Sequence, residues 1–310
     1  MQPVIRVQQV SKRFGAGRVI DRAPRPIDAV DDVSLEVGRG EVLAVVGPNG
    51  AGKTTLLALL LGFLRPTRGT ILIDGDAARD YVRRAGVGYL PEQFRLPPEW
   101  RVRDALYALA RLDGNRAGAA LRADAALERY ALAAVADREL RTLSRGTLQR
   151  VGLAQAFQAE RALIVLDEPT EGLDPLWRVR LRDVIAGARD AGSTVILASH
   201  DLGEVERVAD RAVLLEGGVV REVMTPHARG DGSAYLIRLD APSSILPELF
   251  RGAEREEGES EAYRVVVGSS AELSSRLAAL LETGAVVASV EPLREPLEER
   301  VRRALGGAEA

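Results

Sequence analysis

The stretch VLAVVGPNGAGKTTLLALL, residues 42–60, constrains the fold more than any other part of the sequence. It holds the P-loop pattern Gly-x-x-x-x-Gly-Lys-Thr between a β-branched apolar run, Glu41–Val46, and a leucine-rich segment of helical length. A strand, a glycine-rich turn and a helix in this order direct backbone N–H groups and the positive end of the helix dipole at one point. The stretch therefore predicts a phosphate cradle.

Several residues of this turn have distinct expected roles. Gly47, Gly50 and Gly52 allow left-handed backbone angles and a close approach of phosphate. Lys53 is expected to reach the outer phosphates, and the Thr54 hydroxyl to ligate Mg²⁺. The alternative is an ordinary glycine-rich connection with a solvated lysine, which the flanking strand and helix argue against. The residues expected to bind nucleotide here are Gly47, Pro48, Asn49, Gly50, Ala51, Gly52, Lys53, Thr54 and Thr55.

Composition excludes several kinds of site and partner. The 310 residues carry 42 basic and 45 acidic side chains, so the net charge of −3 gives no footprint of a nucleic-acid partner. The absence of cysteine excludes disulfides and cysteine metal sites. The N-terminal sequence lacks the apolar core of a signal peptide, and the longest apolar run, Leu56–Leu64, is half of the about 18 residues that span a bilayer. We expect a soluble intracellular protein.

Short β-rich segments alternate with helical ones through about residue 220, which predicts an α/β core around a mostly parallel sheet. Between Trp100 and Arg141, alanine, leucine and arginine dominate and indicate a helical insert. We expect a nucleotide-binding domain over residues 1–224, with a helical subdomain at about residues 100–142. The expected strands are Val4–Val10, Val33–Val37, Val42–Val46, Thr70–Ile73, Gly86–Leu90, Ala162–Leu166, Thr194–Ala198 and Ala212–Glu216.

The pattern of apolar and polar residues changes after about Met224. SAYLIRLD, EAYRVVVG and AVVASVEP are typical of strands, SAELSSRLAALLETG of an amphipathic helix, and EPLEERVRRAL of a final helix. They predict a small α+β accessory domain over residues 225–310, with a β-α-β-β-α-β order. Its role stays open between regulation, dimerisation and bracing of the core.

Two further strands end in polar groups suited to a nucleotide site. ALIVLDEPT places Asp167 to orient Mg²⁺ or its water ligands, and Glu168 to activate a water that faces the γ-phosphate, as a general base or by polarisation. TVILASHD ends in Ser199, His200 and Asp201, and His200 is expected to contact the γ-phosphate, with an ordinary strand-end histidine as its alternative. Acidic residues end many strands, so the P-loop upstream is what favours the functional interpretation.

The segment RTLSRGTLQRVGLAQAF places a hydroxyl and a small residue at the start of a predicted amphipathic helix. Ser144 and Gly146 supply a capping group and a close-approach position, so this helix end is a second candidate anion site. A plain helix cap explains the same residues from one chain alone.

Together these motifs resemble the nucleotide-binding subunit of an ATP-binding cassette (ABC) transporter over about residues 4–222. GPNGAGKTT resembles its Walker A motif, LSRGTLQRV its signature, LIVLDEPT its Walker B motif, EGLDP its D-loop and ASHD its switch histidine. Five motifs in the family's order and spacing are far more specific than any one of them. The resemblance implies a P-loop NTPase core of the ABC ATPase type with a helical subdomain.

The resemblance also implies an ATP hydrolase that uses ATP and Mg²⁺ as a head-to-tail dimer with a second copy of itself or a homologous ATPase subunit. Each nucleotide would lie on Lys53 and Thr54 of one subunit and be capped by Ser144 and Gly146 of the other. Asp174, in the D-loop, would connect the two sites.

Some positions depart from the family pattern. In the signature, Arg145 and Thr147 stand where glycine and glutamine are usual, but the two residues most needed for phosphate are kept. At the Q-loop, Glu92 stands where glutamine is usual and Gln93 follows, so either could sense Mg²⁺ or the water; register assigns this catalytic and metal-sensing role to Glu92. Phe14 matches the aromatic position that stacks on adenine, with a core role as its alternative.

The leading hypothesis is an energy-coupling ATPase that is peripheral to the inner face of the cell membrane, bound to a separate permease. GYLPE and EPLREPLEERV resemble the subfamily with ABC-2-like exporters, which implies export. The alternative is a soluble ABC ATPase that acts on ribosomes or DNA, whose members usually carry two cassettes, a coiled coil or zinc modules. A P-loop kinase would have no use for the signature, and an inactive cassette is disfavoured by Lys53, Asp167, Glu168 and His200.

Overall fold

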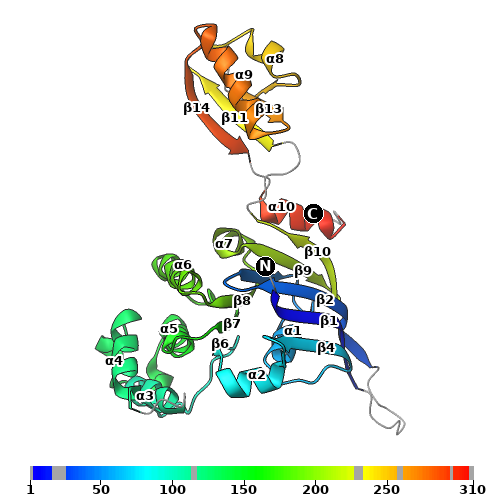
Figure 1. Cartoon of the computed structure of the whole chain (residues 1–310). Coiled ribbons are helices and arrows are strands. Elements are labelled where there is room, and N and C mark those ends of the chain that lie inside the picture. The colour runs from blue at the N-terminus through cyan, green and yellow to red at the C-terminus, as the bar shows by residue number, and fades with distance from the viewer. Residues whose placement is uncertain are drawn as a thin grey trace. The chain divides into compact units, whose positions relative to one another are not determined.

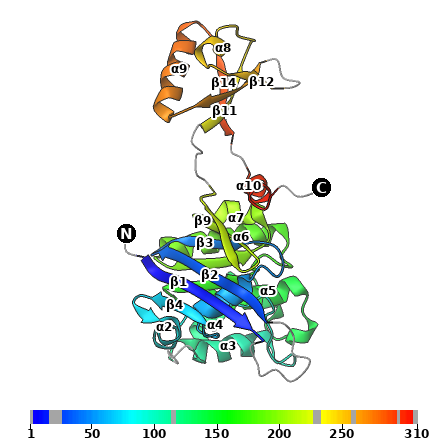
Figure 2. The same ribbon diagram turned by 90° about the vertical axis from the view of Figure 1, so that its right-hand side faces the viewer.

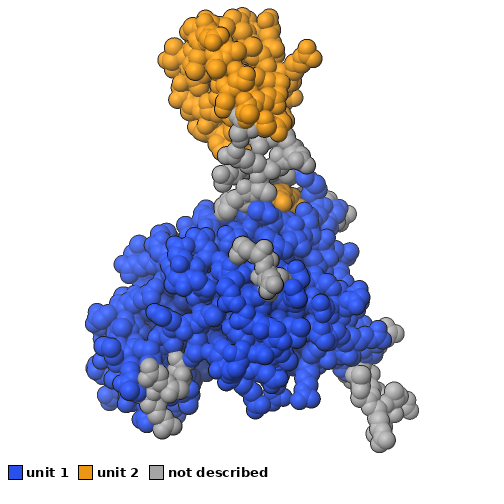
Figure 3. Space-filling view, viewed as in Figure 1, with its two compact units in different colours: residues 1–226, 301–310 blue, residues 227–300 orange. Residues whose placement is uncertain are grey.

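The computed structural model describes residues 3–15, 26–112, 117–226, 233–256, 261–293 and 296–306. The chain forms two compact units, coloured separately in Figure 3: Met1–Pro226 with Val301–Ala310, and His227–Arg300. The assignment of a nucleotide-binding role to residues 1–224 and an accessory role to residues 225–310 stays a prediction, and the two units are described separately below.

The centre of the first unit is a six-stranded sheet in which five strands are parallel and only β10 is antiparallel to its neighbour. In spatial order, its strands are β10 (Val219–Met224), β9 (Arg211–Glu216), β3 (Val42–Val46), β8 (Thr194–Ser199), β7 (Leu163–Asp167) and β6 (Gly88–Leu90). Every residue of β3, β7 and β8 is buried. Burial on both faces explains why these strands are almost continuously apolar rather than alternating.

A second, antiparallel sheet consists of β2 (Ile27–Gly38), β1 (Pro3–Phe14), β4 (Arg68–Ile73) and β5 (Asp76–Ala77), and β1, β2 and β4 lie side by side in Figure 2. Buried and exposed residues alternate toward the end of β2, as expected for a sheet with one face on a core. Six of the eight predicted strand segments lie within strands, whereas the segments predicted for β6 and β7 begin two residues and one residue too early. Strands β1 and β2 are longer than predicted because they pair with each other over most of their lengths.

Helix α1 (Lys53–Leu60) packs against strands of both sheets, and four of its leucines are buried. This packing fixes the helix that follows the P-loop. Figure 1 shows α3 (Val102–Leu112) and α4 (Ala119–Arg129) beside α5 (Arg145–Phe157), in the region predicted to be helical. The other helical elements of this unit are α2 (Ala78–Ala85), η1 (Ala133–Val135), η2 (Leu140–Thr142), α6 (Pro175–Asp190) and α7 (Leu202–Val208).

The second unit contains an antiparallel four-stranded sheet in the order β12 (Glu254–Arg255), β13 (Ala262–Val267), β11 (Ser233–Leu239) and β14 (Val287–Leu293). Helix α8 (Leu246–Leu249) packs on α9 (Ser270–Glu282), which contacts β13. Its core includes Ile237, Phe250, Tyr263 and Leu280, all buried. From β11 to β14 the elements follow the predicted β-α-β-β-α-β order, although the sequence segments quoted for it did not include α8 and β12. Helix α10 (Leu297–Ala304) crosses the boundary between the units, because its residues from Val301 belong to the first one.

Candidate functional site

The P-loop follows β3 and ends where α1 begins, and its first and last glycines are required by packing. Gly47 and Gly52 have φ angles of 151° and 105°, in the region that favours glycine. A Cβ at Gly47 would lie 2.1 Å from the carbonyl oxygen of Leu215, and one at Gly52 would lie 2.2 Å from that of Ala29. These two glycines therefore let the loop approach the protein's own backbone, in addition to any phosphate.

Lys53 is buried although it is charged, with 8% of its surface exposed. Its Nζ donates hydrogen bonds to the carbonyl oxygens of Gly47 at 2.8 Å and Pro48 at 3.3 Å. These bonds curl the loop around the ammonium group. The N-terminus of α1 has no side-chain cap, because Gly52 occupies the capping position. Uncapped N–H groups and a held ammonium are suited to binding an anion.

Beside the loop lies an open cavity of about 610 Å³. Its lining includes the predicted residues Asn49, Gly50, Ala51, Gly52, Lys53, Thr54, Thr55, Glu92, Asp167, Glu168 and His200. It also includes residues that were not among the predicted site residues, namely Ile27, Asp28, Ala29, Glu171 and Gly217. The remaining predicted residues, Phe14, Gly47, Pro48, Ser144, Gly146 and Asp174, do not line it. One cavity thus brings together the ends of β3, β7 and β8.

Asp167, at the end of β7, is a buried carboxylate with spare bonding capacity. Its Oδ2 has no hydrogen-bond partner among the described residues. Burial raises the pKa of Asp167 to about 6, and a hydrogen bond from the Thr54 side chain acts in the opposite direction. A divalent cation beside these two groups would complete the bonding of Oδ2 and favour the ionised carboxylate, so the residues fit Mg²⁺.

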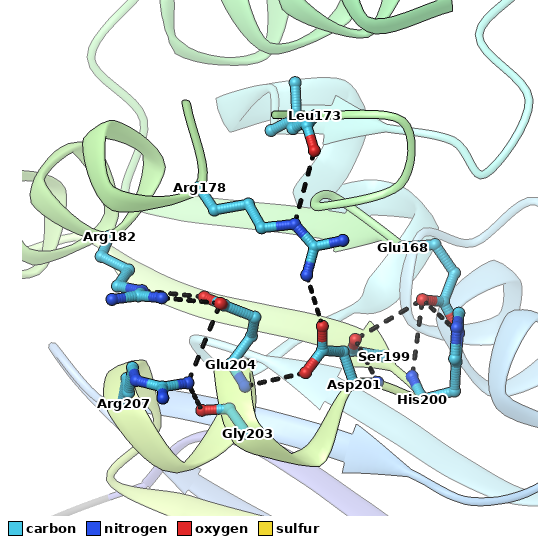
Figure 4. Close-up of polar contacts among 10 residues, drawn as sticks. All are labelled: Glu168, Leu173, Arg178, Arg182, Ser199, His200, Asp201, Gly203, Glu204 and Arg207. Carbon is cyan, nitrogen blue, oxygen red and sulfur yellow. Dashed lines mark hydrogen bonds and ion pairs between the residues drawn. The ribbon is translucent and has the colours of Figure 1, made fainter. Parts of the chain in front are cut away.

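Glu168 is next in the chain and is held toward His200. It has a φ of 49°, unusual for a residue with a side chain, and only 10% of that side chain is exposed. Its Oε2 lies 2.9 Å from Nδ1 of His200 and accepts a hydrogen bond from the His200 backbone N–H at 3.4 Å. Figure 4 shows the Ser199 hydroxyl converging on the same oxygen, at 3.5 Å. The glutamate and histidine predicted from separate motifs are therefore in direct contact.

Gln149 supports this carboxylate from α5, and sequence reasoning missed it. Its side-chain Nε2 donates to the carbonyl oxygens of Glu168 and Pro169, both at 3.1 Å, and the residue is buried. Two bonds to consecutive carbonyls hold the backbone turn in which Glu168 has its positive φ. The one available signal was a glutamine among the apolar residues of a predicted amphipathic helix.

At the Q-loop, the structure separates the two candidate side chains. Glu92 lines the cavity, and its negative charge contributes to the raised pKa of Asp167. Gln93 does not line the cavity, and its Oε1 accepts a hydrogen bond from Arg95 at 2.5 Å. The geometry favours Glu92 as the residue nearer to a bound nucleotide.

Ser144 and Gly146, at the start of α5, do not line this cavity. Ser144 caps the helix, because its Oγ accepts a hydrogen bond from the N–H of Thr147 at 3.2 Å. A Cβ at Gly146 would lie 2.5 Å from the carbonyl oxygen of Gly172, so the signature turn packs closely on the D-loop region. Within one chain these residues therefore have structural roles.

The two residues that depart from the signature pattern both have partners. Arg145 forms an ion pair with Glu171, which lines the cavity. The Thr147 hydroxyl accepts a hydrogen bond from Arg150 at 3.2 Å. Arg145 and Thr147, the residues that differ from the family pattern, thus form contacts that hold the signature turn in place.

Asp174 and Phe14 also have local contacts. Asp174 is the N-cap of α6, where its Oδ1 accepts from the N–H of Trp177 at 2.9 Å. Phe14 is 41% exposed, and the Lys12 ammonium lies 5.1 Å from its ring centroid. Its cross-strand partner on β2 is Ile27, which lines the cavity, so Phe14 stands at the margin of the site.

Comparison with known proteins identifies this arrangement. The sequence profile of the ABC transporter family matches residues 30–171. The Nod factor export ATP-binding protein I of Burkholderia orbicola (strain AU 1054) is 37% identical over 282 residues, which cover 87% of this chain and 88% of that protein. The chain belongs to the ABC transporter family. Its ABC cassette is that of an ATP-binding subunit, as the five sequence motifs predicted.

Other matches have different extents. An uncharacterized ABC transporter ATP-binding protein of Nostoc sp. is 39% identical over 209 residues, and the chain spans only 62% of its length. A dimeric structure of a bacterial ABC transporter cassette superposes with a TM-score of 0.65 at 25% identity, over 72% of this chain and 99% of that one. The predicted P-loop ABC fold is thereby confirmed. Further relatives are named as import or as export ATP-binding proteins, so the chain is similar to subunits of transporters that work in either direction.

Among the described residues of this ABC protein, no helix has both the length and the apolar character needed to cross a bilayer.

Proposed function

We propose that this chain binds and hydrolyses ATP to drive a separate membrane permease. The observation that carries the proposal is the Glu168 carboxylate, held 2.9 Å from His200 at the wall of the cavity that the P-loop also lines. A carboxylate in this position can accept a proton from, or polarise, a water that attacks the γ-phosphate. His200 would orient that water or the phosphate, and Glu92 would sense the metal or the water.

The expected cation is Mg²⁺. Thr54 and Asp167 would hold it, because the Asp167 Oδ2 is buried and unpartnered among the described residues. When bound, it would neutralise charge on the phosphate oxygens. Among those same residues, no three acidic or histidine side chains cluster to form a metal cage. This fits Mg²⁺, which usually keeps waters and substrate phosphates among its ligands.

A head-to-tail dimer would give roles to three of the predicted residues that do not line the cavity, namely Ser144, Gly146 and Asp174. Ser144 and Gly146 lie at the N-terminus of α5 and would cap the nucleotide of the partner subunit there. Support comes from the dimer described for the solved bacterial cassette. The partner would be a second copy of the chain or a homologous ATPase subunit, and Asp174 would lie between the two sites.

The permease would place the chain at the cytoplasmic face of the membrane. Export is the proposed direction, supported by the likeness to the Nod factor export protein over 88% of that protein's length. The likeness of GYLPE to the ABC-2-type exporter subfamily supports the same direction. A non-transport role on a macromolecular complex is the alternative that the experiments below would reveal.

The proposal is tested by phosphate release from Mg-ATP together with mass in solution. We expect the purified chain to release phosphate, to lose this activity when Mg²⁺ is chelated, and to gain dimer when ATP is present. If phosphate release needs the permease, reconstitution with the neighbouring membrane subunit should restore it. A chain that releases no phosphate in either form would contradict the proposed hydrolase.

A first prediction concerns contact with the permease. We expect the segment after the Q-loop, residues 95–100, to face the permease, and Trp100 is 37% exposed there. Reversing the charge of Arg95 together with Trp100→Ala should weaken co-purification with the permease, because exposed aromatic and arginine side chains often dominate interfaces. Basal hydrolysis should stay unchanged. Unreduced co-purification would count against this surface.

A second prediction concerns adenine. If Phe14 stacks on the base, Phe14→Ala should raise the Kd for ATP by about 3–10-fold, the usual value of one aromatic stacking contact. Phe14→Trp should retain affinity because the ring is kept. Fluorescence titration with ATP measures both variants. Equal affinities of Phe14→Ala and the unmodified chain for ATP would show that Phe14 does not stack on adenine.

A further inference from the structure

Arg178, on α6, bridges two loops that belong to different sequence motifs. Its Nη1 donates to Oδ2 of Asp201 at 2.7 Å, and its Nε donates to the carbonyl oxygen of Leu173 at 3.4 Å. Leu173 lies in the D-loop, and Asp201 directly follows His200. Figure 4 shows the guanidinium group between the two. One side chain thus joins the D-loop to the segment that carries the switch histidine.

Asp201 is fixed by two hydrogen bonds in addition to the one from Arg178. Its Oδ1 accepts a hydrogen bond from the N–H of Glu204 at 3.1 Å and so caps α7. Its own N–H donates to the Ser199 hydroxyl at 3.1 Å. A further constraint is the covalent link to His200. With one oxygen on the helix and the other on Arg178, Asp201 connects the arginine to the backbone next to His200.

A second arginine secures the helix behind this loop. Arg182, one turn after Arg178, donates from Nε and Nη2 to the two oxygens of Glu204 at 2.8 and 2.6 Å. Only 9% of the Glu204 side chain is exposed. This bidentate pair holds α7 to α6. Of the two arginines on α6, Arg178 is the one that contacts the loop before α7.

We infer that Arg178 is a positioning residue that links the D-loop to the Glu168–His200 pair. Because the D-loop is the segment expected to meet a partner subunit, Arg178 makes the position of His200 depend on that contact. The inference rests on the proposed function, because the pair it positions is assigned to ATP hydrolysis. The Arg178–Asp201 pair is about one-third exposed, so it should add little to stability while it controls geometry.

The test uses the full chain with Arg178→Met, which keeps the apolar stem and removes the guanidinium. The stem borders a cavity of only about 10 Å³, so its packing must be preserved. We expect kcat to fall by about 10–100-fold, because small misplacements of reacting groups have effects of this size. The KM for ATP and the unfolding temperature should change little.

Three further variants make this test selective. Asp201→Asn keeps the helix cap and loses the charge, so it should resemble Arg178→Met, and the double variant should be no slower than either single one. Arg178→Lys should recover part of kcat. Arg189→Ala, on the same helix and paired at the surface with Asp190, should leave kcat unchanged.

Amide hydrogen exchange of residues 199–204 supplies a readout that does not depend on hydrolysis. Arg178→Met should speed this exchange, whereas exchange in the P-loop, residues 47–54, should not change. Unchanged kcat and exchange, or a large fall in unfolding temperature, would overturn the inference. If the unmodified chain does not hydrolyse ATP, the proposed function fails, and exchange of residues 199–204 alone decides whether Arg178 positions the loop.

Discussion

Replacing Glu168 by glutamine should lower the rate of ATP hydrolysis by at least about 100-fold, the usual contribution of a general base. Glutamine keeps the size of the side chain but cannot accept a proton from the attacking water. The carboxylate is 2.9 Å from His200 and lines the cavity, so its loss acts at the reaction rather than at binding. ATP affinity should stay near that of the unmodified chain, and an ATP-bound dimer should accumulate.

Phosphate release, ATP titration and mass in solution measure these three effects separately. The matched control is Glu171→Gln, which removes a negative charge from the same cavity wall. Unlike Glu168, Glu171 forms its ion pair with Arg145 and not with His200. We expect a much smaller loss of turnover in this control. Equal losses in the two variants would mean that the charge of the cavity matters and that Glu168 has no special role.

Replacing Gly47 by alanine should destabilise the first unit by about 3 kcal/mol or more, since backbone strain and overpacking each cost about 1–3 kcal/mol. The new Cβ would lie 2.1 Å from the backbone carbonyl oxygen of Leu215, where no side-chain rotation can relieve the clash. The loop would have to move away from β9, and ATP binding should be lost with it. Urea unfolding measures the change in stability.

Gly50→Ala is the control for this prediction. Gly50 also has a positive φ, 81°, but among the described residues nothing lies within 4 Å of an added Cβ. Only the cost of the left-handed conformation remains, about 1–2 kcal/mol. Both tryptophans, Trp100 and Trp177, belong to the first unit, so their fluorescence reports its unfolding. Equal free energies of unfolding for the two variants would show that the loop relieves the clash at residue 47 at no cost in stability, which would contradict the prediction.

The order of the motifs made much of the site predictable. The P-loop is a local structure in which a strand, a turn and a helix are consecutive, so residues 42–60 specify it without help from the rest of the chain. Asp167 ends β7, and His200 directly follows the end of β8 in the same parallel sheet. Because the carboxyl ends of parallel strands meet at one edge, the sequence also predicted that these groups share a site.

Other features of the site could not be predicted in this way. Gln149 holds the backbone of Glu168 from 19 residues earlier, and Arg145 reaches Glu171 across 26 residues. Ile27, on the antiparallel sheet, reaches the cavity because its strand pairs with β1. Nothing in the local pattern of such residues distinguishes them from ordinary surface or core positions.

The sequence by itself therefore determined the family, the parallel core and the phosphate cradle. These features depend on residues that are neighbours in the chain, or on polar residues that stand at the carboxyl ends of parallel strands. Only the tertiary structure decided which glycines are held by backbone contact, that Glu168 touches His200, and that Arg178 connects two loops. The physical reason is that hydrogen bonds and steric contacts act over a few ångströms. Which distant residues come within that range is set by how the helices and sheets pack.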